Sequence, residues 1–178
     1  FIYLTGNLTR QVGVRDLSLT VAPREIYGFL GKNGAGKTTT IKLLVGLLKV
    51  QKGEARVLGQ PVSDVAVRRQ IGFLPENPYF YEYLTASETM DFYGQLFRMP
   101  RAERRSRTAK LLDRVGLGKV TRERVGRFSK GMRQRLGIAQ ALINQPELVI
   151  LDEPLTGLDP LGRRDLKEII LELKQEQK

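Results

Sequence analysis

Four residues near the start of the chain have the spacing of a phosphate-binding loop. Gly31, Gly36, Lys37 and Thr38 fit the pattern G-x-x-x-x-G-K-[ST] within "GKNGAGKTT". Glycines allow backbone N–H groups to turn toward phosphate oxygens, and a lysine at this place supplies positive charge to the outer phosphates of a nucleotide. The Thr38 hydroxyl is expected to bind Mg²⁺. The spacing therefore predicts a nucleotide site at this loop.

Two adjacent acids follow the apolar run "LVIL" much later in the chain. Besides the loop hydroxyl, a nucleotide site of this kind needs a carboxylate that holds the metal through water, usually at the end of a neighbouring buried strand. Asp152 fits that role, and Glu153 is placed to polarise a water that attacks the outer phosphate. An Asp-Glu pair alone is an ordinary exit from a strand. The glycine loop upstream favours the functional interpretation.

The elements expected around these residues alternate between strands and helices. We expect a buried strand over 24–31, "REIYGFLG", and a helix over 37–49 with Ile41, Leu44, Leu47 and Leu48 on one face. Further strands are expected in "EARVLG", "IGFLPE" and "ELVILDE". Near-continuous apolar strands between helices predict an α/β fold with a parallel sheet covered by helices.

The segment between the expected strands "IGFLPE" and "ELVILDE" is expected to be entirely helical. Thr85 with Glu88 three residues later forms a capping box, and Ser129 is a good N-cap for a helix to about residue 143. We therefore expect a helical subdomain over 85–144, inserted into an α/β core of 1–84 and 145–178. The chain starts without Met and ends inside an expected helix, so we interpret it as a single domain whose C-terminal part is missing.

Composition narrows the class of protein. With 178 residues, 41% apolar and 28% charged, the chain should fold as one globular domain. It has no cysteine, which excludes disulfides and thiolate metal sites and makes the cytosol the expected compartment. The net charge is +11. The stretch from Arg98 to Arg135 contains fourteen Lys or Arg residues and only three acids. This stretch is either a solvated helical face or a surface for nucleic acid or anionic membrane, and it contains a single aromatic residue, Phe128, too few to stack on successive bases.

Taken together, these residues resemble the nucleotide-binding domain of ABC ATPases. The Walker A segment is Gly31 to Thr39, the Walker B segment is Leu148 to Glu153, and "TGLDP" resembles the D-loop. "FSKGMRQRL" resembles the ABC signature, with Ser129-Lys130-Gly131-Met132 where Ser-Gly-Gly-Gln is usual. The motifs occur in the family's order, and the resemblance covers the chain from about residue 14 to its end.

This resemblance implies a P-loop NTPase fold, ATP and Mg²⁺ as cofactors, and ATP hydrolysis in a head-to-tail dimer, either a homodimer or a pair with another ABC ATPase subunit. The implied catalytic base is Glu153. The implied phosphate-binding residues are Gly31, Asn33, Gly34, Ala35, Gly36, Lys37, Thr38 and Thr39. Metal binding falls to Thr38, Asp152 and Glu76, the signature acting across the dimer is Ser129, Lys130, Gly131 and Met132, and the D-loop is Gly157, Leu158 and Asp159.

The sequence departs from the family pattern at several positions. Lys130 and Met132 replace the usual Gly and Gln of the signature, and the Q-loop position holds Glu76 instead of Gln. No aromatic is evident for stacking on adenine, because Val12 stands near the expected place. The chain has no histidine, so the family's switch His, together with the last core strand, would lie beyond Lys178.

Within the family, "ENPYFYEYLT" and "EPLTGLDPLGRR" resemble ATPase subunits of bacterial multidrug or ABC-2-type exporters. That implies export through a transmembrane permease, a peripheral location on the inner face of the cell membrane, and no nucleic-acid partner. The aromatic cluster Tyr79, Phe80, Tyr81 and Tyr83 follows the Q-loop position, where family members receive a coupling helix. Clustered aromatics mark either such an interface or core packing.

Two other functions stay open from the sequence. One is a soluble ABC ATPase that acts on nucleic acid or the ribosome through the basic stretch, which would show a steep salt dependence of binding. The other is a P-loop kinase or switch outside the ABC class, in which Ser129 is an ordinary N-cap; it would phosphorylate an acceptor and form no ATP-driven dimer.

Overall fold

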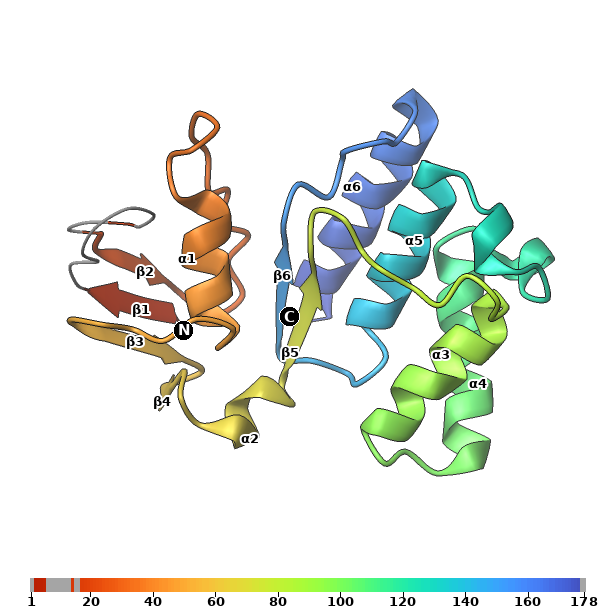
Figure 1. Ribbon diagram of the computed structural model, residues 1–178, viewed down its shortest axis with the longest axis horizontal. Coiled ribbons are helices and arrows are strands. Elements are labelled where there is room, and N and C mark those ends of the chain that lie inside the picture. The colour runs from red at the N-terminus through yellow and green to blue at the C-terminus, as the bar shows by residue number, and fades with distance from the viewer. Residues whose placement is uncertain (1, 6–13, 15–16, 177–178) are drawn as a thin grey trace.

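The computed structural model describes residues 2–5, 14 and 17–176 (Figure 1). Its strands are β1 (Ile2–Thr5), β2 (Leu19–Val21), β3 (Glu54–Val57), β4 (Gln60–Pro61), β5 (Ile71–Leu74) and β6 (Leu148–Leu151). Its helices are α1 (Lys37–Leu44), α2 (Val65–Arg68), α3 (Ala86–Leu96), α4 (Arg101–Arg114), α5 (Lys130–Ala141) and α6 (Pro160–Gln175), with short 3-10 turns at Gly118–Val120 and Val125–Arg127.

The strands form two sheets. β5 and β6 pair in parallel, with Ile71 opposite Leu148 and Leu74 opposite Leu151. β2, β1, β3 and β4 form an antiparallel sheet in that order. The α/β class is confirmed, but the expectation of one parallel sheet is wrong. β2 has three residues and β4 has two, which is too short for an alternating pattern to be recognised in the sequence.

The strand expected over 24–31 is also wrong. That segment forms no strand, Ile26 and Tyr27 are about half exposed, and Leu30 is 92% exposed. An apolar run becomes a strand only where a neighbouring strand pairs with its backbone N–H and C=O groups, and no described strand pairs with this one. The composition of segment 24–31 therefore does not show whether a neighbouring strand is available to pair with it.

The first helix is shorter than expected. α1 ends at Leu44, and Gly46 follows with a φ of +72°. The N–H groups of Gly46 and Leu47 donate to the carbonyls of Leu43 and Lys42, which is a Schellman motif that closes the helix. Leu47 and Leu48, expected on its apolar face, are therefore outside the helix and exposed.

Two hydrophobic clusters meet at the β5–β6 pair. One contains Ile41 and Leu44 of α1 together with Ile71 and Ile150, and the other contains Leu74 and the buried faces of α3, α4, α5 and α6. Figure 1 accordingly shows α1 on one side of this pair and α5 and α6 on the other. The pair thus lies between the glycine-loop helix and the remaining helices.

The last helix before β6 lies unusually close to β5. A Cβ on Gly72 would lie 2.1 Å from the carbonyl oxygen of Ala141, and a Cβ on Gly137 would lie 2.5 Å from a methyl of Leu74. Neither glycine has a positive φ. Glycine is required at these positions because the two elements approach each other too closely for any side chain.

Local hydrogen bonds define the ends of the helices, as predicted for two of them. Thr85 accepts from the N–H of Glu88 and the Glu88 carboxylate accepts from the N–H of Thr85, which confirms the capping box. These bonds hold the pKa of the Glu88 carboxyl below its usual value. The N-cap at Ser129 is confirmed, because its hydroxyl oxygen accepts a hydrogen bond from the N–H of Met132. Beyond α5, Arg107 donates to the carbonyls of Leu142 and Ile143, and its burial lowers the pKa of its guanidinium.

None of the helices within the described part of the chain combines the length and apolarity needed to cross a bilayer.

The glycine contact between α5 and β5 generates a stability prediction. Gly72→Ala should lower the free energy of unfolding by about 2 kcal/mol, because its methyl group would overlap the Ala141 carbonyl. Urea unfolding followed by circular dichroism measures the change. Gly28→Ala is the matched control, since no atom lies within 4 Å of a Cβ there. Equal stability of the two variants would contradict the argument.

Candidate functional site

The glycine loop turns sharply into the N-terminus of α1. Gly34 and Gly36 have φ values of +82° and +89°, a left-handed conformation that favours glycine, and Gly36 is the N-cap. The N–H of Ala35 donates to the carbonyl of Lys32. A helix N-terminus leaves backbone N–H groups without intrahelical partners and carries partial positive charge. The loop and the first turn of α1 therefore form a surface suited to phosphate oxygens.

The ammonium of Lys37 lies across this loop. Its Nζ donates to the carbonyl of Gly31 at 2.8 Å and to that of Lys32 at 3.4 Å. The same nitrogen lies 3.7 Å from Oε1 of Glu153. The structure thus brings together the two motifs that the sequence singles out for phosphate chemistry, although they lie far apart along the chain.

The paired acids follow β6 and differ in environment. Asp152 is 3% exposed, and its N–H donates to the carbonyl of Leu74, which extends the β5–β6 pairing by one residue. Glu153 has a φ of +49° and a side chain that is about half exposed. A left-handed conformation costs a residue with a side chain about 1 kcal/mol or more. This turn separates the two carboxylates, directing Asp152 inward and Glu153 toward Lys37.

The residues predicted for the metal offer oxygen ligands. Mg²⁺ typically binds one or two protein oxygens and completes its shell with water and phosphate oxygens. The buried Asp152 carboxylate and the Thr38 hydroxyl in the first turn of α1 are such a donor set. In the part of the chain that the structure describes, no three His, Cys, Asp or Glu residues gather as a metal site of their own. The donor set therefore fits a cation that arrives with a nucleotide.

The signature-like segment begins α5 and contacts the D-loop-like turn of the same chain. A Cβ on Gly131 would lie 3.3 Å from the carbonyl oxygen of Gly157, and the aliphatic stem of Lys130 lies over Gly157, whose φ is +78°. After this turn, Asp159 accepts from the N–H of Gly162 and caps α6. Leu158 between them is buried in the helical cluster.

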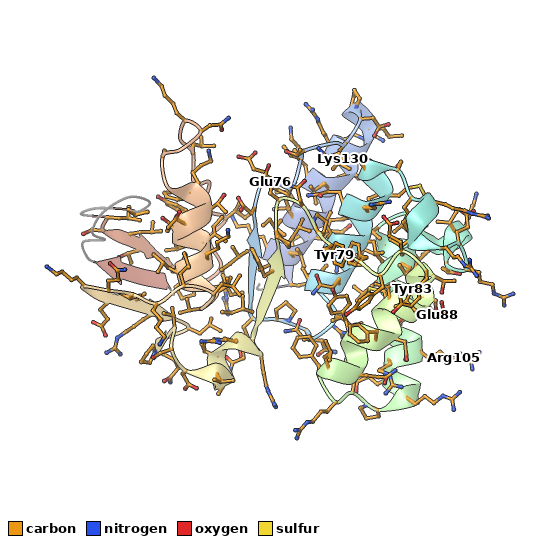
Figure 2. All side chains as sticks on the ribbon, viewed as in Figure 1. Glu76, Tyr79, Tyr83, Glu88, Arg105 and Lys130 are labelled. Carbon is orange, nitrogen blue, oxygen red and sulfur yellow. The ribbon has the colours of Figure 1, made fainter. Side chains whose placement is uncertain are left out.

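A cleft of about 460 Å³ separates the start of α5 from the segment after β5. Glu76 is exposed at this cleft and shares it with Lys130; both residues are labelled in Figure 2. The remaining lining residues are Asn77, Pro78, Phe128, Arg133 and Gln134. Glu76 is thus placed beside the signature helix. Val12, named for the adenine position, lies outside the described residues.

Sequence reasoning missed Gln134. This side chain is 2% exposed on α5, and its amide donates to the carbonyl of Pro154, next to Glu153. The signal was available, because Gln134, Ile138 and Ala141 share the i, i+4, i+7 spacing of one helical face. A glutamine on an apolar face needs a hydrogen-bond partner.

The aromatic cluster divides between core and surface. Phe80 is buried and contacts Tyr93 edge-on, so of the two interpretations left open for the cluster, core packing holds for this residue. Tyr79 and Tyr83 are 81% and 68% exposed, and Tyr81 lies between them with ring centroids 6.4 and 5.7 Å away. We call Tyr79, Tyr81 and Tyr83 the tyrosine surface; Figure 2 labels its two outer members. Among these four aromatic residues, Phe80 alone is buried.

Part of the basic stretch stabilises the protein itself. Arg104 pairs with Asp91, Arg114 with Glu172 and Glu176, Arg133 with Glu82, and Arg135 with Asp165. Arg107 caps carbonyls, as described above. Five of the fourteen cations therefore make contacts within the protein itself, which favours the structural interpretation of this stretch over a continuous surface for nucleic acid.

Comparison with known proteins identifies the family of this fold. A solved structure described as the ATP binding subunit of an ABC transporter is 34% identical, covers 98% of this chain and 75% of its own length, and superposes with a TM-score of 0.86. This confirms the P-loop NTPase fold of ABC ATPases. The profile of the family described as ABC transporter matches residues 14–156. The chain belongs to the ABC transporter family.

Curated relatives agree with this assignment. An uncharacterized ABC transporter ATP-binding protein of Synechocystis sp. is 47% identical over 181 residues, covering 99% of this chain and 51% of the relative. The bacitracin transport ATP-binding protein BcrA of Bacillus licheniformis is 41% identical over 181 residues, covering 98% of this chain and 58% of BcrA. The chain spans about half the length of the curated relatives it matches.

The position of Lys37 generates a binding prediction. Lys37→Ala should weaken ATP affinity roughly 10- to 100-fold, because a charge-assisted bond to phosphate is lost. Titration with a fluorescent ATP analogue measures the dissociation constant. Lys42→Ala, on the exposed side of the same helix, is the control and should bind as the parent protein does. Unchanged affinity in Lys37→Ala would remove this lysine from the site.

Proposed function

We propose that this chain binds ATP with Mg²⁺ and hydrolyses it, as the ATP-binding subunit of an exporter. The observation that carries the proposal is the position of Glu153 beside Lys37 at the mouth of the glycine loop. A carboxylate within 3.7 Å of the lysine that contacts the outer phosphates is within reach of a water that attacks the γ-phosphate. Family membership supports the same activity.

The residues of the site take separate roles in this proposal. The loop from Gly31 to Thr39 binds the phosphates with its backbone N–H groups, and Lys37 exchanges its loop carbonyls for phosphate oxygens. Thr38 and Asp152 would hold Mg²⁺, with Glu76 as a third contributor. When bound, the cation neutralises charge that develops on the phosphates. Glu153 accepts a proton from the attacking water.

We propose that two copies, or this chain and a related subunit, form the complete site. At the N-terminus of α5, the N-cap Ser129 and the first residue Lys130 are both exposed. Free N–H groups at such an end favour an anion, and Ser129 with Gly131 would meet the γ-phosphate bound by the partner's glycine loop. The residues from Gly157 to Asp159 would line the same interface.

We propose that the membrane partner docks on the tyrosine surface. Three exposed tyrosines backed by Phe92 form an aromatic patch of the kind enriched at protein interfaces. The name of BcrA describes a transport ATP-binding protein, which supports a similar task for this chain. A peripheral location on the inner face of the cell membrane follows from a permease bound at this surface.

The role of Glu153 is tested by Glu153→Gln. Turnover should fall about a hundredfold or more, because the amide cannot accept the proton, while ATP binding persists. An ATP-dependent dimer should then accumulate on size-exclusion chromatography. Glu147→Gln, at an exposed position just before β6, is the matched control and should keep full turnover. Undiminished turnover in Glu153→Gln would refute the assigned role.

The docking surface is tested by the double variant Tyr79→Ser and Tyr83→Ser. Stability in urea should change little because both side chains are exposed, while the fraction of the protein that sediments with membranes of its own cell should fall. Phe80→Ser is the contrasting variant and should lower the free energy of unfolding by about 3–5 kcal/mol. Full membrane association of the double variant would move the docking surface elsewhere.

A further inference from the structure

One part-buried hydrogen bond joins α5 to the turn that follows Glu153 in the same chain. The side-chain amide of Gln134 donates to the carbonyl of Pro154 at 3.3 Å, and Gln134 is 2% exposed. Pro154 directly follows Glu153, whose backbone has the unfavourable φ of +49°. The contact therefore acts on the peptide unit immediately after the strained residue.

The helix that carries Gln134 is held firmly in place. Gly72 and Gly137 allow α5 to lie directly on β5, which pairs with β6, the strand that leads to Glu153. Around the same turn, the N–H of Thr156 donates to the carbonyl of Glu153, and the stem of Lys130 covers Gly157. Gln134 thus ties the turn to a helix that is packed closely against the sheet.

We propose that Gln134 is a positioning residue for Glu153, holding its carboxylate toward Lys37 through the Pro154 carbonyl. This inference rests on the proposed ATPase function. Without the amide, the turn relaxes toward an ordinary φ and the carboxylate moves away from the attacking water. Since the N-terminus of α5, which lies just before Gln134, would contact the phosphate of the second site, the same helix then links the base of one site to the phosphate contact of the other.

The test compares Gln134→Met with Gln140→Met in the full chain. Gln140 lies on the same helix six residues later, about 9 Å along its axis, and is partly exposed. Loss of one hydrogen bond to a neutral carbonyl should lower kcat about three- to tenfold in Gln134→Met, with the ATP dissociation constant unchanged and the melting temperature lowered by only a few degrees. Gln140→Met should match the parent protein in all three.

A second variant, Gln134→Glu, tests the positioning role through the pH dependence of kcat, which a purely structural role would not change. Gln134→Glu places a carboxylate against the Pro154 carbonyl at pH 8, and that carboxyl can donate a hydrogen bond only once it is protonated. Its kcat, divided by that of the parent protein at the same pH, should rise as pH falls from about 8 to 6, because a buried carboxyl titrates at raised pH. A circular dichroism melt at each pH shows whether the fold itself changes.

The outcomes separate the inference from the function on which it rests. A parent protein without ATPase activity removes the proposed function and this inference with it. An active parent protein with undiminished kcat in Gln134→Met overturns the inference alone. An equal loss of ATP binding and kcat, or a pH-independent ratio for Gln134→Glu, also overturns it, because Gln134 would then only support the fold.

Discussion

The site depends on the direct contact between α5 and β5. At Gly72 the carbonyl of Ala141 occupies the place where a Cβ would be, and at Gly137 a methyl of Leu74 does the same. Protein interiors are close-packed, so such a contact leaves no freedom to slide. The contact sets where α5 begins, and hence where Ser129 and Lys130 lie. It also sets which residue of α5 faces the turn after β6.

The turn from Glu153 to Leu158 is consequently enclosed by elements from both hydrophobic clusters. On one side Lys37 of α1 lies beside Glu153, and on the other side Lys130 and Gln134 of α5 contact Gly157 and Pro154. The β5–β6 pair lies between these two groups of helices (Figure 1). A displacement of either α1 or α5 would therefore move the same six residues, 153–158.

The parts of the site that could be predicted from the sequence are those encoded over a few residues. The glycine loop, the capping box at Thr85 and the N-cap at Ser129 depend on local geometry, so spacing is enough. The segment 24–31 could not be assigned correctly, because strand formation depends on a partner that its own residues do not specify. The same limit applies to Phe80 and Tyr79, since neighbouring aromatics separate into core and surface only when the helices beneath them are in place.

The two loop carbonyls that hold the Lys37 ammonium have a consequence for which anions can enter. An incoming ion must replace the bonds to Gly31 and Lys32 and also compete with the Glu153 carboxylate for the same nitrogen. Chloride or a single small oxyanion offers few contacts in exchange, whereas a polyphosphate reaches the ammonium while it also fills the backbone N–H groups along the loop. The existing bonds of Lys37 therefore disfavour binding of the abundant small inorganic anions of a cell and favour a polyphosphate.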